Sequence, residues 1–127
     1  MRSKLFERGS VILPAILIIC QLLFSGCAHD KQELHIKKDA VVTYNCENGA
    51  DIRAEYFSLS DSSLHFVKIF MPDGKEYTLP QVVSGSGARY TEGREIEWWI
   101  KGDSVMIKRH TDEGDWTAIF HKCVVEK

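Results

Sequence analysis

Residues 81–101 read QVVSGSGARYTEGREIEWWIK, and their pattern decides how the rest of the chain is interpreted. A short apolar run breaks at residues 84–87, where two glycines make a continued strand unfavourable. The chain then alternates through residues 88–91, turns, and alternates again through two tryptophans to Lys101. Because neighbouring strand positions face opposite sides of a sheet, one of Trp98 and Trp99 is expected to point outward. The stretch predicts short strands joined by a glycine-rich loop and a tight turn.

Similar segments extend in both directions from this stretch. Polar residues interrupt β-branched and aromatic ones, and turn residues separate the segments at spacings of roughly 8 to 12 residues. No segment shows the apolar period of an amphipathic helix. The sequence therefore predicts an all-β domain, either an antiparallel barrel or a sandwich, too small to enclose a large ligand. The expected strands cover residues 41–46, 52–59, 64–71, 75–83, 88–91, 95–101, 104–109 and 116–123.

Residues 1–26 are predicted to be an export signal. A basic start precedes an apolar run at residues 11–24, which has the length of a signal peptide and is short for a membrane-spanning helix. Cys27 follows two small residues, which resembles a bacterial lipobox, although Phe24 stands where leucine is usual. We expect cleavage before Cys27 and a diacylglycerol thioether on its sulfur. The alternative is an ordinary signal peptide cut near Ala28, which would leave a soluble periplasmic protein.

The residues after the predicted cleavage site indicate location and domain limits. Ala28 stands where enterobacterial lipoproteins kept at the inner membrane typically carry aspartate. We therefore expect a lipid anchor in the outer membrane of a Gram-negative bacterium, with the domain in the periplasm. Residues 27–39 are polar and lack strand periodicity, so they are expected to form a tether. The β-domain is expected to span residues 40–127.

The cysteines support an exported domain. Cys20 would leave with the signal and Cys27 would carry the lipid, so Cys46 and Cys123 remain as a pair. Disulfides persist in oxidising compartments, and a bridge across so long a loop stabilises a domain by about 4 kcal/mol in the chain-entropy model. A zinc site fits less well, because no CxxC or HxH motif lies nearby. A disulfide between Cys46 and Cys123 is therefore the prediction.

Charge and side-chain chemistry exclude several functions. The chain has 16 basic and 18 acidic side chains, and loss of residues 1–26 would leave 13 and 17, a net charge of −4. This balance does not suit nucleic-acid binding, but it suits a basic partner. The five histidines lack metal-ligand spacing, and no GxSxG motif supports a serine nucleophile. We expect neither an enzyme nor a cofactor or metal site.

Several motifs occur together in an order that is much less common than any one of them. They are Leu79-Pro80-Gln81, the run SGSGARY at residues 84–90, Trp99-x-Lys101-Gly102, Tyr44-x-Cys46, the terminal Cys123 and the lipobox-like start. Together they resemble the membrane-bound inhibitors of c-type lysozyme and their periplasmic relatives. The resemblance covers essentially the whole mature domain. It implies an eight-stranded antiparallel β-barrel, here closed by the bridge between the first and last strands.

The resemblance also implies a mechanism and a set of site residues. In this family a serine loop enters the active-site cleft of c-type lysozyme, where a serine hydroxyl binds the catalytic carboxylates. By motif position that serine is Ser86, and Lys101 would add an ammonium group to the same acidic cleft. A loop with donors and no carboxylate suits such a cleft. The candidate lysozyme-binding residues are Ser84, Gly85, Ser86, Gly87, Ala88, Arg89, Tyr90 and Lys101.

Two departures from the family pattern keep an alternative open. Ile100 stands where Ser or Thr is usual before the lysine, and the Trp98-Trp99 pair replaces a more modest aromatic. Either change could redirect Lys101 or alter which lysozymes are bound. The alternative is an envelope lipoprotein with a structural or assembly role that does not bind lysozyme.

Overall fold

The computed structural model describes residues 33–127, and in this part of the chain it contains β-strands without helices. Predicted features of residues 1–32, namely the export signal, the Cys27 lipid and the first part of the tether, lie outside the described residues. Between residues 33 and 127 there is no helix long and apolar enough to cross a membrane. The strands are β1 (Ile36–Cys46), β2 (Asp51–Leu59), β3 (His65–Phe70), β4 (Glu76–Val82), β5 (Ala88–Thr91), β6 (Ile96–Lys101), β7 (Ser104–His110) and β8 (Trp116–Val125).

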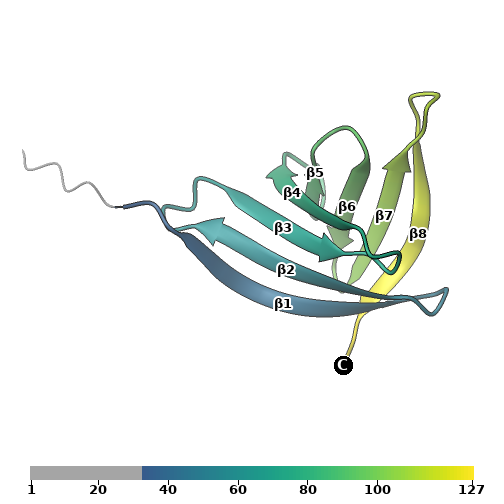
Figure 1. The fold of residues 1–127 in the computed structure, drawn as a ribbon, viewed down its shortest axis with the longest axis horizontal. Coiled ribbons are helices and arrows are strands. Elements are labelled where there is room, and N and C mark those ends of the chain that lie inside the picture. The colour runs from purple at the N-terminus through teal and green to yellow at the C-terminus, as the bar shows by residue number, and fades with distance from the viewer. Residues whose placement is uncertain (1–32) are drawn as a thin grey trace, which may run out of the picture. The chain divides into compact units, whose positions relative to one another are not determined.

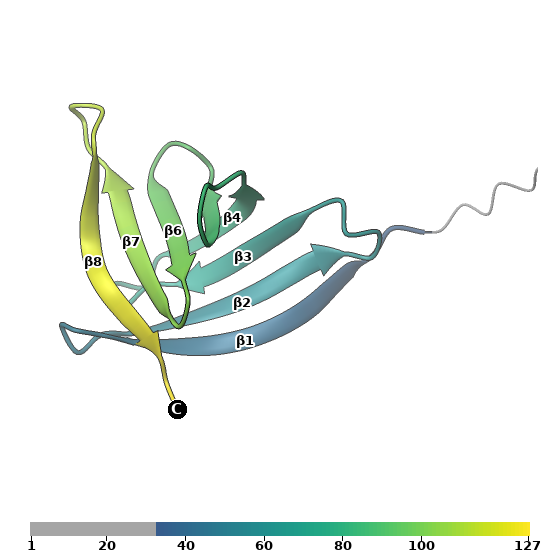
Figure 2. The same ribbon diagram turned by 180° about the vertical axis from the view of Figure 1, so that it is seen from behind.

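The strands form a closed antiparallel barrel in which each strand pairs with the next and β8 pairs with β1. Figures 1 and 2 show β1, β2 and β3 side by side, with β6, β7 and β8 crossing them and β4 and β5 between the two groups. All eight strands belong to one unit, Leu34–Lys127. The prediction of a small all-β, eight-stranded barrel is confirmed.

Strand β1 begins earlier than the sequence suggested. It starts at Ile36, inside the segment expected to be a tether as far as residue 39, and Ile36 pairs with Leu59 of β2. Side chains 36–41 are exposed, so no alternation of apolar and polar residues marks this part of the strand. Backbone pairing and an ion pair between Lys38 and the carboxylate of Glu55, 2.9 Å apart, hold it instead.

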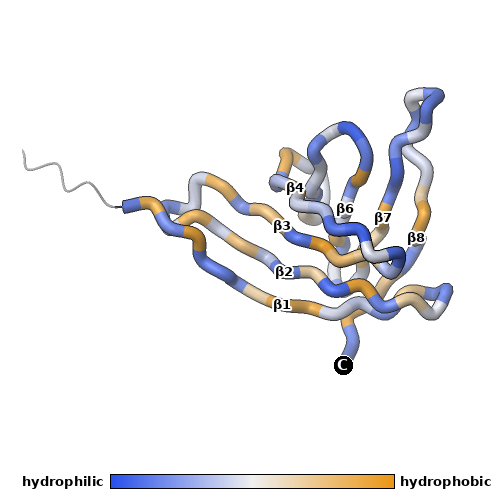
Figure 3. The backbone as a smooth tube through the Cα atoms, in the orientation of Figure 1, coloured by the Kyte–Doolittle hydropathy of each residue, from blue (hydrophilic) through white to orange (hydrophobic). Residues whose placement is uncertain are grey.

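The barrel interior is filled by side chains. The side chains that are essentially inaccessible to solvent include Trp98, Ile52, Ile69, Leu79, Ile96, Ile107, Val67 and Val105. The Trp98 indole donates a hydrogen bond of 3.1 Å to the Tyr56 hydroxyl, which lies 2.9 Å from the Tyr44 hydroxyl. Burial raises the pKa of both tyrosines, so they stay neutral donors and acceptors. Figure 3 shows hydrophobic stretches along the strands and mostly hydrophilic turns between them.

A disulfide closes the seam between the first and last strands. Cys46 and Cys123 lie opposite each other where β1 meets β8, and they form the predicted bond across a sequence separation of 77 residues. Closing a loop of this length stabilises the fold by about 4 kcal/mol in the chain-entropy model. The seam contains three paired positions, and backbone hydrogen bonds from Glu47 to the Lys122 carbonyl and from Glu126 to the Thr43 carbonyl extend it.

Candidate functional site

The candidate site is built on the loop between β4 and β5, residues 83–87, which we call the serine loop. Strand pairing ends at Val82 and Arg89, so the serine loop projects beyond the last paired positions. Its Ser86 is exposed, and Val83 is 93% exposed. Among residues 33–127 the Ser86 hydroxyl makes no hydrogen bond. The tip therefore presents a free hydroxyl and an apolar side chain.

The Ser86 carbonyl holds the loop in shape. It accepts a hydrogen bond of 2.7 Å from the Ser84 hydroxyl, which stays within the loop. It also accepts one of 2.9 Å from the indole Nε1–H of Trp99 on β6. The second bond ties the loop tip to the barrel wall.

Gly87 brings the serine loop against the end of β6. Its φ is +65°, and a Cβ atom at this position would lie 2.0 Å from the Ile100 carbonyl oxygen and 3.4 Å from Cγ of Lys101. A larger residue would have both an unfavourable backbone conformation and a direct clash. The glycine therefore lets the loop and Lys101 sit side by side.

The outer face of β6 and β7 carries a cation–π arrangement beside the loop. The Nζ atoms of Lys101 and Lys108 lie 3.9 Å and 4.7 Å from the centre of the Trp99 ring. Such contacts contribute about 0.5–1 kcal/mol each when exposed. They place the Lys101 ammonium over the same indole that donates to the Ser86 carbonyl.

A buried carboxylate connects this face to the other end of the serine loop. Glu97 is 5% exposed and lies 3.1 Å from Nζ of Lys108 and 3.6 Å from Nη1 of Arg89. Arg89 in turn donates a hydrogen bond of 3.2 Å to the Val83 carbonyl. The serine loop is thus held near both of its ends by residues that face outward from β5 and β6.

The structure brings most of the predicted site residues together. Ser84, Gly85, Ser86, Gly87, Arg89 and Lys101 lie at one edge of the barrel. Tyr90 does not join them, because it is 7% exposed and its ring meets that of Tyr56 inside the barrel, 6.0 Å away. Ala88 is half-buried and pairs with Ile100. The side chains of Tyr90 and Ala88 thus pack toward the core at the base of the serine loop and are not presented to a partner.

The two departures from the family pattern have different structural meanings. Ile100 packs its side chain against the core, so it does not face a partner; its carbonyl oxygen is what meets Gly87. Trp98 points inward and Trp99 outward, so one of the pair faces outward, as predicted, and the structure shows which one.

Sequence reasoning missed the roles of Trp99, Glu97 and Lys108. A signal was present. Glu97, Trp99 and Lys101 alternate with apolar Ile96, Trp98 and Ile100 along one strand.

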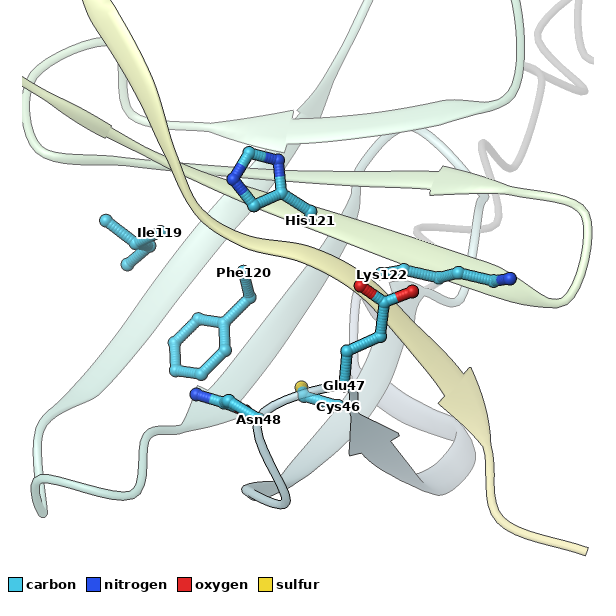
Figure 4. A pocket seen from close by; sticks show the side chains of 7 residues that line it. All are labelled: Cys46, Glu47, Asn48, Ile119, Phe120, His121 and Lys122. Atoms are coloured by element: carbon cyan, nitrogen blue, oxygen red, sulfur yellow. The ribbon is translucent and has the colours of Figure 1, made fainter.

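One hollow on the described surface is lined by no residue of the serine loop. It is a pocket of about 320 Å³ at the end of β1 (Figure 4). Among residues 33–127 no cluster of His, Cys, Asp and Glu could hold a metal ion. The pocket is lined by Cys46, Glu47, Asn48, Ile119, Phe120, His121 and Lys122, none of which belongs to the predicted site.

Comparison with known proteins gives consistent results. Residues 44–116 match the model of a family described as membrane-bound lysozyme-inhibitor of c-type lysozyme. A protein named membrane-bound lysozyme inhibitor of C-type lysozyme, from Pseudomonas aeruginosa, is 31% identical over 114 residues, covering 82% of this chain and 80% of that protein. One of the same name from Cupriavidus necator is 33% identical over 99 residues, covering 78% and 76%.

A solved structure shares the fold. The crystal structure of Pseudomonas aeruginosa MliC in complex with hen egg white lysozyme superimposes with a TM-score of 0.53 at 22% identity. The match covers 74% of this chain and 85% of that one.

Proposed function

The chain belongs to the family of membrane-bound inhibitors of c-type lysozyme, and we propose that it inhibits a c-type lysozyme by placing its serine loop and Lys101 in the active-site cleft. The observation that carries the proposal is the close approach of the serine loop, which presents a free Ser86 hydroxyl, to Lys101 at the end of β6, an approach that Gly87 permits. The relatives are named as inhibitors, which fits a protein that binds an enzyme rather than acting as one.

The chemistry of the tip suits a cleft that contains two carboxylates. A glycoside hydrolase of the lysozyme type works with a pair of acidic side chains. Residues 83–87 contain hydroxyl and backbone donors and no carboxylate, and Lys101 adds a positive charge. Hydrogen bonds from such donors to a charged acceptor are stronger than bonds between neutral groups. An acidic residue at the tip would instead be repelled.

The position of the inhibitor is part of the same proposal. The relatives are named as membrane-bound, which supports lipid attachment at Cys27 and a domain facing the periplasm from the outer membrane. There the inhibitor would protect peptidoglycan from a lysozyme that enters the envelope. The excess of acidic over basic side chains, 18 against 16, favours approach to a basic partner.

The test measures inhibition of a c-type lysozyme by the disulfide-bonded chain from residue 28 onward. We expect wild-type inhibition, a loss of roughly ten- to hundredfold in Ser86→Ala, where bonds to a charged acceptor are removed, and about tenfold in Lys101→Ala, with weaker salt dependence. Ser63→Ala, in the exposed turn after β2, and Lys122→Ala, near the pocket, serve as matched controls.

The outcomes separate the two functions that the sequence left open. A folded, oxidised wild type that neither inhibits nor binds immobilised lysozyme would contradict the proposal and favour a structural role in the envelope. Equal losses in the control variants would show that surface charge or general destabilisation, not the serine loop, governs inhibition.

A further inference from the structure

Trp99 holds a position that core packing does not explain. It lies on the outer face of β6, opposite Arg89 of β5 and Met106 of β7, and is only half-buried. A large aromatic side chain on the outer face of a strand can change rotamer and turn into solvent unless specific contacts hold it against that face. Trp99 has three such contacts, and all of them involve the candidate site or its supporting charges.

The first contact fixes the loop. The Nε1–H of Trp99 donates to the Ser86 carbonyl at 2.9 Å, and the other bond to that carbonyl comes from Ser84 in the same loop. Removing the indole donor would therefore leave the Ser86 carbonyl bonded within its own loop, without its hydrogen bond to β6. Trp99 is what links the residue with the free hydroxyl to the sheet.

The second and third contacts direct Lys101. Its ammonium lies 3.9 Å from the ring centre, and among residues 33–127 it forms no salt bridge. Lys108, near the same ring at 4.7 Å, is fixed by Glu97 at 3.1 Å. Glu97 holds Lys108 in place, whereas Lys101 has no ion-pair partner among residues 33–127. The Trp99 ring is therefore the group that orients Lys101.

We propose that Trp99 is a positioning residue that holds the serine loop and Lys101 in one arrangement before lysozyme is bound. The inference deepens the proposed function and rests on it for its effect on inhibition. Fixing a loop in its bound shape reduces the ordering entropy lost on association, and so increases affinity without adding a contact. An inhibitor in which only a fraction of molecules hold the competent shape binds more weakly by that fraction.

The first experiment needs no lysozyme. Backbone order parameters of residues 84–87 are measured by NMR relaxation in wild type, Trp99→Phe and Trp116→Phe, all with the disulfide intact. Phenylalanine keeps a ring for the lysines but removes the N–H donor. We expect order parameters near 0.8 in wild type and Trp116→Phe, falling below about 0.6 in Trp99→Phe. Trp116 is the matched control, because it is also half-buried but contacts His110 at 5.1 Å, away from the loop.

The second experiment is a double-mutant cycle on inhibition. Trp99→Phe is expected to weaken inhibition roughly three- to tenfold, the effect of one hydrogen bond. Most of that loss should disappear in the Ser86→Ala background, because the indole acts through the position of the Ser86 hydroxyl. Trp99→Leu, which also removes the ring, should lose more and reduce the further effect of Lys101→Ala.

The results distinguish this inference from the proposed function. Unchanged loop order in Trp99→Phe, or losses in the cycle that simply add, would overturn the positioning role. The serine loop could instead loosen in Trp99→Phe while the wild type inhibits no c-type lysozyme. That pair of results would support the positioning role of Trp99 and contradict the proposed function.

Discussion

Trp98 and Trp99 occupy neighbouring positions on β6 and face opposite sides of the barrel wall. Trp98 is inaccessible to solvent, donates to the Tyr56 hydroxyl, and meets the Tyr44 ring edge-on at 5.3 Å. Trp99 is half-buried, donates to the backbone of the serine loop, and lies between two lysines. The same type of side chain thus packs in the core on one face and contacts the proposed binding loop on the other.

The inner face controls mainly the stability of the fold, and the outer face is expected to control mainly the affinity for a partner. Inside the barrel, volume and satisfied hydrogen bonds decide the free energy of unfolding. On the outer face, the contacts of Trp99 hold the serine loop and Lys101, which we propose to meet a partner. Loss of these contacts is expected to change affinity more than stability. The alternation of a single strand keeps these two requirements apart, and the predictions below test that separation.

The largest expected effect is on stability, from Trp98→Phe. This change leaves a cavity and removes the donor to Tyr56, so the free energy of unfolding should fall by about 2–3 kcal/mol. Trp99→Phe should change it by less than about 1 kcal/mol. Denaturant unfolding of both oxidised variants measures the contrast. Equal losses in the free energy of unfolding would show that the two faces do not differ in their contribution to stability.

Gly87→Ala should separate binding from stability by a different route. The new Cβ would stand 2.0 Å from the Ile100 carbonyl in a backbone with φ of +65°, so the serine loop must shift. We expect a stability loss of about 1–2 kcal/mol from strain and a loss of inhibition of about tenfold or more.

The control for Gly87→Ala is Gly93→Ala in the turn between β5 and β6. Gly93 has φ of +80° and no atom within 4 Å of an added Cβ, so this variant has the strain without the clash. Its stability should fall similarly while inhibition stays at the wild-type level. Full inhibition by Gly87→Ala would show that the loop tolerates displacement.

The smallest effect is expected from Ile100→Thr, which restores the residue type usual in the family. Ile100 packs against the core, so the change should reduce stability by about 1 kcal/mol through lost apolar contact and a half-buried hydroxyl. Inhibition should stay within roughly twofold of wild type, because the backbone carbonyl that meets Gly87 remains. A large gain or loss in inhibition constant would mean that residue 100 reaches the partner.

The sequence predicted the fold well because turn residues and alternation are local signals. Residues 49, 74, 93 and 114 are glycines with positive φ that mark turns between strands, and the expected strand limits lie close to the observed ones. The exception is the start of β1, where both faces of residues 36–41 are exposed and pairing with β2 is a non-local interaction. Local patterns carry no information about such pairing.

The site was only partly predictable. Motif order selected Ser86 and Lys101 as candidates, and the structure brings the loop and the lysine together. Tyr90 was included because it completes the motif, but strand alternation places it inside the barrel. The bond from Trp99 to the Ser86 carbonyl joins residues 13 positions apart through the pairing of β5 with β6, which residue types alone do not reveal.

The short seam between β1 and β8 has a consequence for how the protein can be made. Three paired positions, two flanking backbone hydrogen bonds and the disulfide close the barrel there. In a reducing cytosol that bond would be missing, and opening of the seam would expose two long strand edges able to pair with other chains. Recombinant production without export should therefore yield aggregates, whereas delivery to an oxidising compartment closes the last edge as the domain folds.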